Sequence, residues 1–228
     1  MIAGKVEKAI AAVARGEFVI VVDDEDRENE GDLILGASRA TPEAIAFMLR
    51  HTSGIVCATL PAERLAELHL PLMVAENTDS YGTAFTVSAD YRRGTTTGIS
   101  AADRSATLRA LADSAIGPGE FARPGHVFPL RCRAGGVLRR RGHTEAASDL
   151  ARLAGLGPYG VLSEIMNPDG TVAKGAELQR FARRFELLQI SIADLVAFRR
   201  RHESLIEHIA EATLPTQHGS FTGHAARF

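Results

Sequence analysis

The sequence has few cysteines, few tyrosines, no tryptophan and no long apolar run. Its 228 residues include two cysteines, Cys57 and Cys132, three tyrosines and no tryptophan. Two cysteines cannot build a disulfide framework or a four-ligand zinc site by themselves, so both thiols are expected to be reduced. No apolar run reaches the roughly 18 residues of a membrane helix, and residues 1–15 read as an amphipathic helix with Glu and Lys rather than as a signal peptide. We therefore expect a cytoplasmic protein with no membrane partner.

A large excess of charge of either sign is also missing. The chain has 26 Lys and Arg against 28 Asp and Glu, a net charge of -2, and 45% hydrophobic residues. This composition is typical of one ordinary globular domain with a core of useful size. The basic runs at 139–141 and 199–201 are weak evidence for nucleic-acid binding, because short basic runs are usually solvated faces. We expect no nucleic-acid partner.

Helical and strand patterns alternate along the chain. Thr41 before Pro42 marks one helix start, and Ser100 three residues before Asp103 resembles a capping box that opens another. The predicted helices cover residues 3–15, 42–51, a short segment from 62, 100–113, 145–154, 176–185 and 193–203. The predicted strands cover residues 18–22, 32–37, 54–60, 84–88, 126–132, 160–166 and 187–192. This mixture predicts a single α+β domain of three-layer α/β type, in which helices flank a mixed β-sheet.

The most unusual segment is acidic. Residues 23–32 (DDEDRENEGD) hold seven carboxylates against Arg27 alone and join two short apolar segments rich in β-branched residues. Neighbouring carboxylates repel by roughly 1 kcal/mol per pair in water, and a hard cation would relieve this repulsion. Mg²⁺ fits best, because it prefers oxygen ligands and takes one or two protein carboxylates. If the chain is extended here, Glu28, Glu30 and Asp32 share one face. The alternative is a solvated acidic turn.

Two segments have the composition of anion sites at helix starts. Residues 94–100 (GTTTGIS) precede a helix, where unpaired backbone amides favour a phosphate. A plain cap and turn explains this segment equally well when it is judged alone. Residues 139–145 (RRRGHTE) lead three arginines into another helix. Arginine makes bidentate contacts with phosphate, Gly142 permits close backbone approach, and a neutral His143 is able to ligate a metal if the acidic segment lies nearby.

Three single residues suit chemistry but have simpler explanations. Glu164 lies within an apolar strand pattern, where an inward carboxylate must be paired or have a raised pKa and then suits acid–base work. That interpretation fails if Glu164 faces solvent. His126 lies between turn residues and a strand and, alone, favours a structural role. Cys57 is most simply a small core residue. Residues 70–81 form a loop-rich stretch where we expect a substrate lid.

Taken together, these segments resemble the 3,4-dihydroxy-2-butanone 4-phosphate synthase family of riboflavin biosynthesis. The resemblance covers about residues 5–204, and the motifs stand in the family's order and approximate spacing. The motifs that carry it are DDEDRENEGDLI (23–34), RHTSG (50–54), TAFTVS (83–88), GTTTGISAADR (94–104), RPGHVFPLR (123–131), GGVLRRRGHTEAASDLARLAG (135–155) and IADLV (192–196). Several of them are too long to be coincidence.

The resemblance implies a lyase that converts D-ribulose 5-phosphate into formate and L-3,4-dihydroxy-2-butanone 4-phosphate. It implies a requirement for Mg²⁺ or Mn²⁺, with two ions in each active site. Proton abstraction next to the ketone gives an enediolate, whose charge a divalent ion stabilises. Loss of water, a carbon-skeleton shift and release of formate then follow. The resemblance also implies a homodimer with the active site near the subunit boundary.

The same resemblance implies a role for each matching residue. Glu28 and His143 are the metal ligands. His126, Glu164, Glu28 and Asp32 form the catalytic set. The substrate-binding set is Arg27, Asp32, Arg140, Arg141, Gly142, His143, Thr144, Glu164, Thr97 and Cys57. Within this set, Arg140 and the Thr144 backbone are favoured for the phosphate, and Arg141 occupies a variable position that adds positive charge. Asp23, Glu30 and Ser100 are expected to line the site.

The last residues of the chain resemble a different protein. Residues 1–204 form the synthase domain, and residues 205–228 resemble the start of a GTP cyclohydrolase II domain whose zinc-binding cysteines have no counterpart here. We interpret this tail as a truncated junction of a bifunctional enzyme. We expect the tail to be partly disordered or packed on a neighbour.

The sequence is also compatible with three other functions. The first is a Mg²⁺-dependent phosphatase or aldolase-like lyase that acts on another sugar phosphate with the same acidic segment. The second is a sugar-phosphate sensor that keeps the fold without turnover, although the presence of Glu28, His126, His143 and Glu164 argues against such decay. Nucleic-acid binding through the basic runs is a distant third.

Overall fold

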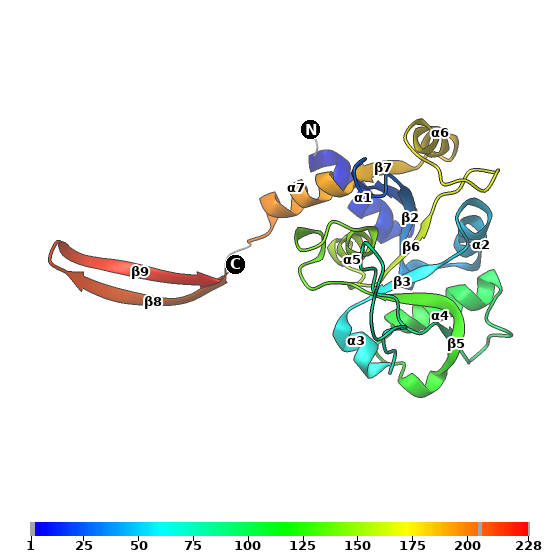
Figure 1. Ribbon diagram of the computed structural model, residues 1–228, viewed down its shortest axis with the longest axis horizontal. Helices are drawn as coiled ribbons and strands as arrows, with labels where there is room; N and C mark the ends of the chain where they lie inside the picture. The colour runs from blue at the N-terminus through cyan, green and yellow to red at the C-terminus, as the bar shows by residue number, and fades with distance from the viewer. Residues whose placement is uncertain (1–2, 205–206, 228) are drawn as a thin grey trace.

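A seven-stranded mixed sheet forms the centre of the computed structural model, which describes residues 3–204 and 207–227 (Figure 1). The strand order is β4-β5-β3-β6-β2-β1-β7. The strands are β1 (Val19–Val22), β2 (Gly31–Gly36), β3 (Cys57–Leu60), β4 (Ala89–Tyr91), β5 (Phe121–Arg131), β6 (Gly160–Glu164) and β7 (Leu188–Ser191). The helices are α1 (Ala3–Arg15), α2 (Pro42–His51), α3 (Ala62–Glu67), α4 (Ala101–Ala112), α5 (His143–Leu153), α6 (Ala176–Arg184) and α7 (Ile192–His202).

The sheet is mixed because two of its strand pairs are parallel. β1 pairs with β7, and β3 pairs with β5, in parallel registers. The β1–β2, β2–β6, β3–β6 and β4–β5 pairs are antiparallel. In the part of the chain that the structure describes, no helix is both long and apolar enough to cross a membrane.

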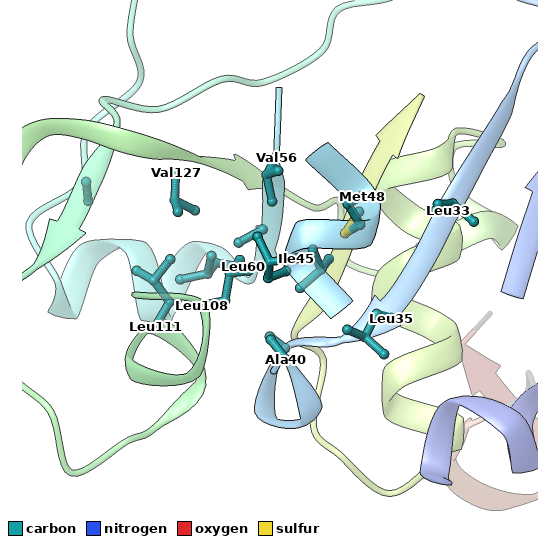
Figure 2. Close-up of a cluster of buried hydrophobic side chains, with 14 of the residues drawn as sticks. Leu33, Leu35, Ala40, Ile45, Met48, Val56, Leu60, Leu108, Leu111 and Val127 are labelled. Carbon is teal, nitrogen blue, oxygen red and sulfur yellow. The ribbon is translucent and has the colours of Figure 1, made fainter. Parts of the chain in front are cut away.

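Both faces of the sheet are covered by helices, as the three-layer prediction requires. Along β1 and β2, Ile20, Leu33 and Leu35 belong to one buried cluster with residues of α2 and α4. Figure 2 shows Leu33 and Leu35 in this cluster together with Ile45 and Met48 of α2. The alternate residues Val19 and Ile34 pack in a second cluster with residues of α1, α5 and α7. Because successive side chains of a strand point to opposite faces, continuous apolar strands are expected where both faces are buried.

The helix starts confirm one capping prediction fully and another in part. The Thr41 hydroxyl accepts a hydrogen bond from the Ala44 amide at 3.2 Å, with Pro42 in the first turn. The Ser100 hydroxyl likewise accepts from the Asp103 amide at 3.0 Å. The predicted capping box is nevertheless wrong, because the Asp103 carboxylate accepts from the backbone and hydroxyl of Thr96 and from the Gly98 amide instead.

The predicted strand at 84–88 is also wrong. Phe85 and Thr86 form only isolated bridges, and the regular strand β4 begins afterwards at Ala89. The Thr86 amide donates to the Pro129 carbonyl at 3.0 Å. Proline has no amide hydrogen to donate back, so the ladder with β5 cannot continue through this position.

Within the described residues, the tail forms a regular antiparallel hairpin. β8 (Glu207–Thr216) pairs with β9 (Gly219–Arg227), and Figure 1 shows this hairpin extending away from the sheet. The expectation of disorder is therefore wrong for these residues, while residues 205 and 206 at the predicted boundary lie outside the described part. Leu214 faces Phe221 across the hairpin, and both are exposed. Because an isolated two-stranded hairpin is marginally stable, packing on a neighbour stays a prediction, as does the resemblance to a cyclohydrolase domain.

Candidate active site

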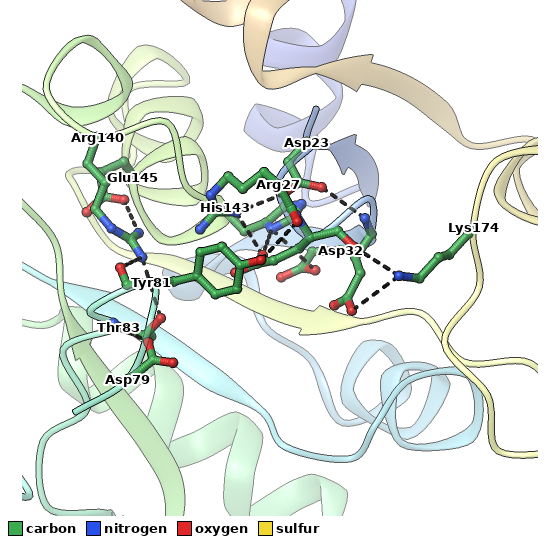
Figure 3. A network of polar contacts seen from close by, with 12 residues as sticks. Asp23, Arg27, Asp32, Asp79, Tyr81, Thr83, Arg140, His143, Glu145 and Lys174 are labelled. Atoms are coloured by element: carbon green, nitrogen blue, oxygen red, sulfur yellow. Dashed lines mark hydrogen bonds and ion pairs between the residues drawn. The ribbon is translucent and has the colours of Figure 1, made fainter. Parts of the chain in front are cut away.

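A hollow of about 120 Å³ lies where the acidic turn between β1 and β2, the end of β6 and the start of α5 meet. These elements are distant in sequence, and strand pairing brings them together. Figure 3 shows the polar side chains of this region converging. The lining residues are Arg27, Glu28, Asp32, Thr83, Phe85, Leu130, Arg140, His143, Thr144, Leu162 and Glu164. Most of the predicted site residues therefore share one pocket.

Asp23 organises the acidic turn. Its Oδ1 accepts a hydrogen bond from the Glu30 amide at 2.9 Å, and its Oδ2 accepts from the Glu28 amide at 3.0 Å and from Arg27 Nη1 at 2.9 Å. Burial would raise the pKa of Asp23, but these hydrogen bonds hold it below its usual range. Asp23 is thus committed to holding the turn, which the sequence did not indicate.

The turn does not present three carboxylates in one extended row. Asn29 adopts a left-handed φ of 54°, which interrupts the two-residue alternation between Glu28 and the strand that follows. Glu28 and Asp32 line the pocket, whereas Glu30 is not among the lining residues and lies 4.0 Å from the Lys174 ammonium. The predicted extended row is therefore wrong, although Glu28 and Asp32 both line the pocket.

His143 is the first residue of α5 and is buried against the two acidic residues. Its Nδ1 lies 3.3 Å from Glu28 Oε2 and 3.9 Å from Asp32 Oδ1. His143 Nε2 and Asp32 Oδ1 are buried and have no hydrogen-bond partner among the described residues. A buried polar atom without a partner is costly, so these two atoms indicate where a bound group would complete the site.

The charges of the pocket are strongly coupled. Burial lowers the pKa of His143, but the carboxylates of Asp32, Glu28 and Asp23 outweigh it and raise that pKa to about 9. Burial raises the pKa of Asp32 to about 7, and the nearby carboxylates of Glu164 and Glu28 add to the effect. Hydrogen bonds from His143 and Arg27 hold the pKa of Glu28 below its usual range despite its burial. The pocket therefore favours a cation.

The donor atoms present fit a hard divalent cation. Ligand atoms of Asp23, Glu28 and His143 all lie within 4.8 Å of one another. Both oxygens of Asp23 already accept hydrogen bonds, so Glu28 and His143 are the better ligands, with the unpartnered Asp32 oxygen beside them. Carboxylate oxygen with one imidazole suits Mg²⁺ or Mn²⁺ better than it suits a metal that prefers sulfur ligands.

Arg140 is fixed on the opposite wall of the pocket. Its Nη1 donates to Glu145 Oε2 at 2.7 Å, and its Nη2 donates to the Tyr81 carbonyl at 3.0 Å. Gly142 precedes α5 in an extended conformation and offers no capping side chain, so the first amides of the helix are open to an anion. A Cβ added at Gly142 would overlap the Arg140 guanidinium. The close approach that Gly142 permits is used by the Arg140 guanidinium, and its use by a ligand stays a prediction.

Gly142→Ala is expected to weaken substrate binding selectively. The φ of Gly142 is -120°, which alanine adopts freely, so the added methyl acts mainly by displacing the Arg140 guanidinium. We expect KM for an anionic substrate to rise about tenfold with a smaller change in kcat, as the loss of one charge-assisted contact implies. Steady-state kinetics would show this. Gly119→Ala, where an added Cβ has open space, is the matched control. An unchanged KM would contradict the assignment.

Two residues that the sequence analysis did not single out hold the acidic turn from either side. The Tyr81 hydroxyl donates to the Arg27 carbonyl at 2.9 Å, and the Arg27 guanidinium lies 4.9 Å from the centre of the Tyr81 ring. Lys174 Nζ donates to the Glu28 carbonyl at 2.9 Å (Figure 3). The end of the predicted lid at 70–81 hinted at Tyr81, but no sequence signal pointed to Lys174.

Glu164 and Cys57 lie on the β6 side of the pocket. Glu164 ends β6, lines the hollow and accepts a hydrogen bond from the Ser53 hydroxyl at 2.6 Å, so its carboxylate is paired. Cys57 on β3 is buried in a hydrophobic cluster and does not line the hollow. Burial raises the pKa of its thiol well above the usual value. Cys57 thus supports the pocket as a core residue, and a substrate contact by it stays a prediction.

Ser100, which was expected to line the site, caps α4 and is not among the residues that line the hollow. Three further predicted site residues also lie elsewhere in the single chain. His126 and Thr97 are not among the residues that line the hollow, and His126 pairs with Asp90 instead. Arg141 lines a separate surface hollow beside α7. Arg140 and Arg141 are adjacent in the chain but line separate hollows, at a turn where the Gly142 amide donates to the Arg140 carbonyl at 3.0 Å. The roles of these three residues in the site stay predictions.

Comparison with protein families gives one match. The 3,4-dihydroxy-2-butanone 4-phosphate synthase model matches residues 7–198. The chain is 56% identical over 224 residues to the riboflavin biosynthesis protein RibBA of Salinispora arenicola, which covers 98% of this chain and 53% of that protein. It is 56% identical over 219 residues to RibBA of Nocardia farcinica, again covering 53% of that protein. The chain therefore spans about half the length of these curated relatives.

Two solved structures agree with the family match. A 3,4-dihydroxy-2-butanone 4-phosphate synthase in complex with two magnesium ions superposes with a TM-score of 0.83 and 47% identity, covering 86% of this chain and 97% of that one. RibBX of A. baumannii, a two-domain synthase, gives a TM-score of 0.87 and 45% identity, covering 97% of this chain and 66% of that one. The mixed sheet and its helices thus have close counterparts among solved synthases.

Proposed function

Because the chain belongs to the 3,4-dihydroxy-2-butanone 4-phosphate synthase family, we propose that it converts D-ribulose 5-phosphate into L-3,4-dihydroxy-2-butanone 4-phosphate and formate in the cytoplasm. We propose Mg²⁺, with Mn²⁺ as a substitute and two ions per site. The observation that carries the proposal is the placement of Glu28 beside His143, with two unpartnered buried atoms next to them. A solvated acidic turn would leave no such buried atoms.

Different residues of the pocket have different proposed roles in this reaction. Arg140 and the open amides at the start of α5 suit the phosphate, because guanidinium and helix amides both favour an anion. Asp32, whose pKa is about 7, is able to take and return a proton near neutral pH. Glu164, which is held by Ser53 and pairs with Asp32 across β2 and β6, is a second proton carrier beside it. A divalent ion held by Glu28 and His143 would stabilise negative charge on the substrate oxygens.

One assay tests the proposal against its alternatives. Purified protein with ribulose 5-phosphate and Mg²⁺ is expected to release formate, and EDTA is expected to abolish the release. Release of inorganic phosphate without formate would indicate the phosphatase. Binding of the sugar phosphate with no product would indicate the sensor. Well-folded, metal-replete protein that yields no formate would remove the proposed function.

We propose that a second copy of the chain brings His126 and Thr97 to the pocket. Both residues lie outside the hollow in the single chain. The surface near them carries Ile55 and Ile99, each 47% exposed, and Arg104 joins this region by donating to the carbonyls of Gly54 and Ile99. Exposed apolar side chains close to a polar site are typical of a surface that another molecule covers. A homodimer of this kind would complete the predicted catalytic set.

Cation binding is expected to strengthen as pH rises. His143 must lose its proton to ligate a metal, and its pKa is raised to about 9, so the apparent Mg²⁺ affinity should rise about tenfold per pH unit between pH 7 and 9. Calorimetry in two buffers of different ionisation enthalpy should detect about one proton released per site at pH 7.5. His143→Asn should remove that release, and an affinity that does not change with pH would contradict the assignment.

The same shift predicts the opposite trend for the stability of the cation-free protein. A histidine whose pKa is raised by folding stabilises the folded state fully below its unfolded pKa of about 6.5. That contribution is lost as pH rises through about 9. Stability and cation affinity should therefore move in opposite directions over this range.

A further inference from the structure

His126 lies in an irregular excursion of β5 opposite β4. The register pairs Ala89 with Val127 but the next residue, Asp90, with Ala122, so residues 123–126 have no counterpart on β4. The excursion is tightly packed, because a Cβ added at Gly125 would overlap the backbone of Ala89 and Asp90. Irregularities of this kind re-aim a side chain and are common beside functional sites.

Asp90 closes this excursion with both of its carboxylate oxygens. Its Oδ1 accepts a hydrogen bond from the His126 backbone amide at 2.8 Å, and its Oδ2 lies 2.7 Å from His126 Nδ1. The Asp90 side chain is 11% exposed, whereas the His126 side chain is 39% exposed. The carboxylate therefore holds the buried side of the imidazole and leaves the other side accessible.

Asp90 itself is held in place by the turn at 96–98. A Cβ added at Gly98 would overlap the Asp90 carboxylate, and Gly98 has a φ of +92° that suits glycine. Asp103 fixes this turn by accepting from the amides of Thr96 and Gly98. Two motifs that are separate in the sequence, residues 94–104 and 123–131, are thus one packed unit around Asp90.

This geometry has a consequence for the protonation of His126. An ionised carboxylate only accepts hydrogen bonds, so the nitrogen facing Asp90 must carry the proton in a neutral imidazole. Nδ1 is that nitrogen, and Nε2 is then left as the free acceptor on the accessible side. Contact with the amide and with Nδ1 fixes both the position and the orientation of the ring.

We propose that Asp90 is a positioning residue that holds His126 as the Nδ1-protonated tautomer, so that Nε2 takes a proton from substrate. The proposal rests on the proposed function, because it gives His126 a part in turnover. Asp90 itself does not touch substrate. It stabilises the positive charge that His126 acquires on taking the proton, as buried carboxylates do in other acid–base pairs.

Asp90→Asn is the sharpest test, because the amide keeps the shape but cannot accept from both the backbone amide and Nδ1 in the same way. We expect kcat for formate release to fall about a hundredfold or more, with KM changed less than threefold, since general acid–base catalysis contributes about that much. Asp113→Asn, which makes the same charge change at the exposed C-terminal cap of α4, should behave as the unchanged protein. Wild-type kinetics in Asp90→Asn would overturn the proposal.

A second measurement does not depend on turnover or on the folding of Asp90→Asn. The ¹⁵N shifts of the His126 ring in the unchanged protein report its tautomer, assigned by comparison with His126→Gln. A ring protonated on Nδ1 is expected. A ring protonated mainly on Nε2 would overturn the proposal even if formate is produced. If the unchanged protein yields no formate, the proposed function fails, and with it the turnover part of this inference.

Discussion

Replacement of Glu28 by glutamine is expected to abolish formate release, with kcat reduced at least about a thousandfold. Glu28 accepts from Arg27 Nη1 at 2.8 Å and lies 3.3 Å from His143 Nδ1. A glutamine carbonyl preserves the volume and one hydrogen bond, but it is a much weaker ligand for a hard cation. The formate assay at saturating Mg²⁺ and a direct Mn²⁺ titration would measure the two effects.

The acidic turn supplies its own control for this substitution. Glu25→Gln removes the same charge from an exposed residue three positions away and should leave kcat within about twofold, because exposed charges are strongly screened. Equal losses in both variants would point to the general negative field of the turn rather than to a ligand. Full activity in Glu28→Gln would remove the predicted cation site.

Mixing two inactive variants is expected to restore activity. If the pocket of one subunit receives His126 from the other, a dimer of Glu28→Gln and His126→Ala chains contains one intact site. After random subunit exchange, half of the dimers are mixed and each has one working site of two, so about a quarter of the sites should be active. Formate release after co-refolding or co-expression would show the recovery.

A second pair of variants tests whether the recovered activity requires residues from two subunits. Glu28→Gln mixed with His143→Ala should stay inactive, because both residues lie in the same pocket of the same chain. Recovery in that pair, or none in the first pair despite proven exchange, would contradict a site completed by the second copy. Size-exclusion chromatography with light scattering would establish that the mixed dimers form.

The layered fold was predictable because its signals are local and periodic. Continuous apolar strands such as β1 and β2 indicate burial on both faces, and Thr41 before Pro42 indicates a helix start without any knowledge of the rest of the chain. The strand at 84–88 was mispredicted because its failure depends on Pro129 opposite it, which is a non-local cause. The hairpin of the tail was missed although β8 and β9 are neighbours in the sequence, because these residues were interpreted as the start of another domain rather than by their own strand pattern.

The residue types of the site could be predicted from the sequence, but their arrangement in space could not. The acidic and basic segments were identified from their residues, and Glu28 and His143 do meet. Which of the neighbouring residues face the pocket could not be predicted from the sequence. Asp23 holds the turn, and Glu30, which follows the left-handed Asn29, does not line the pocket. Arg140 and Arg141 line separate hollows. These outcomes depend on single φ angles and on packing partners, which a sequence pattern does not specify.

The sequence alone determined which chemical groups the protein contains. It also determined which strands and helices carry them, because the hydrophobic periodicity and the capping signals extend over only a few residues. Only the tertiary structure decided which groups meet. It placed His143 against Glu28 across 115 positions of the chain and left two buried atoms there without partners. It also joined Asp90 to His126, which lies outside the pocket. The reason is physical: a site is made by the packing of distant segments, whose energy no local pattern contains.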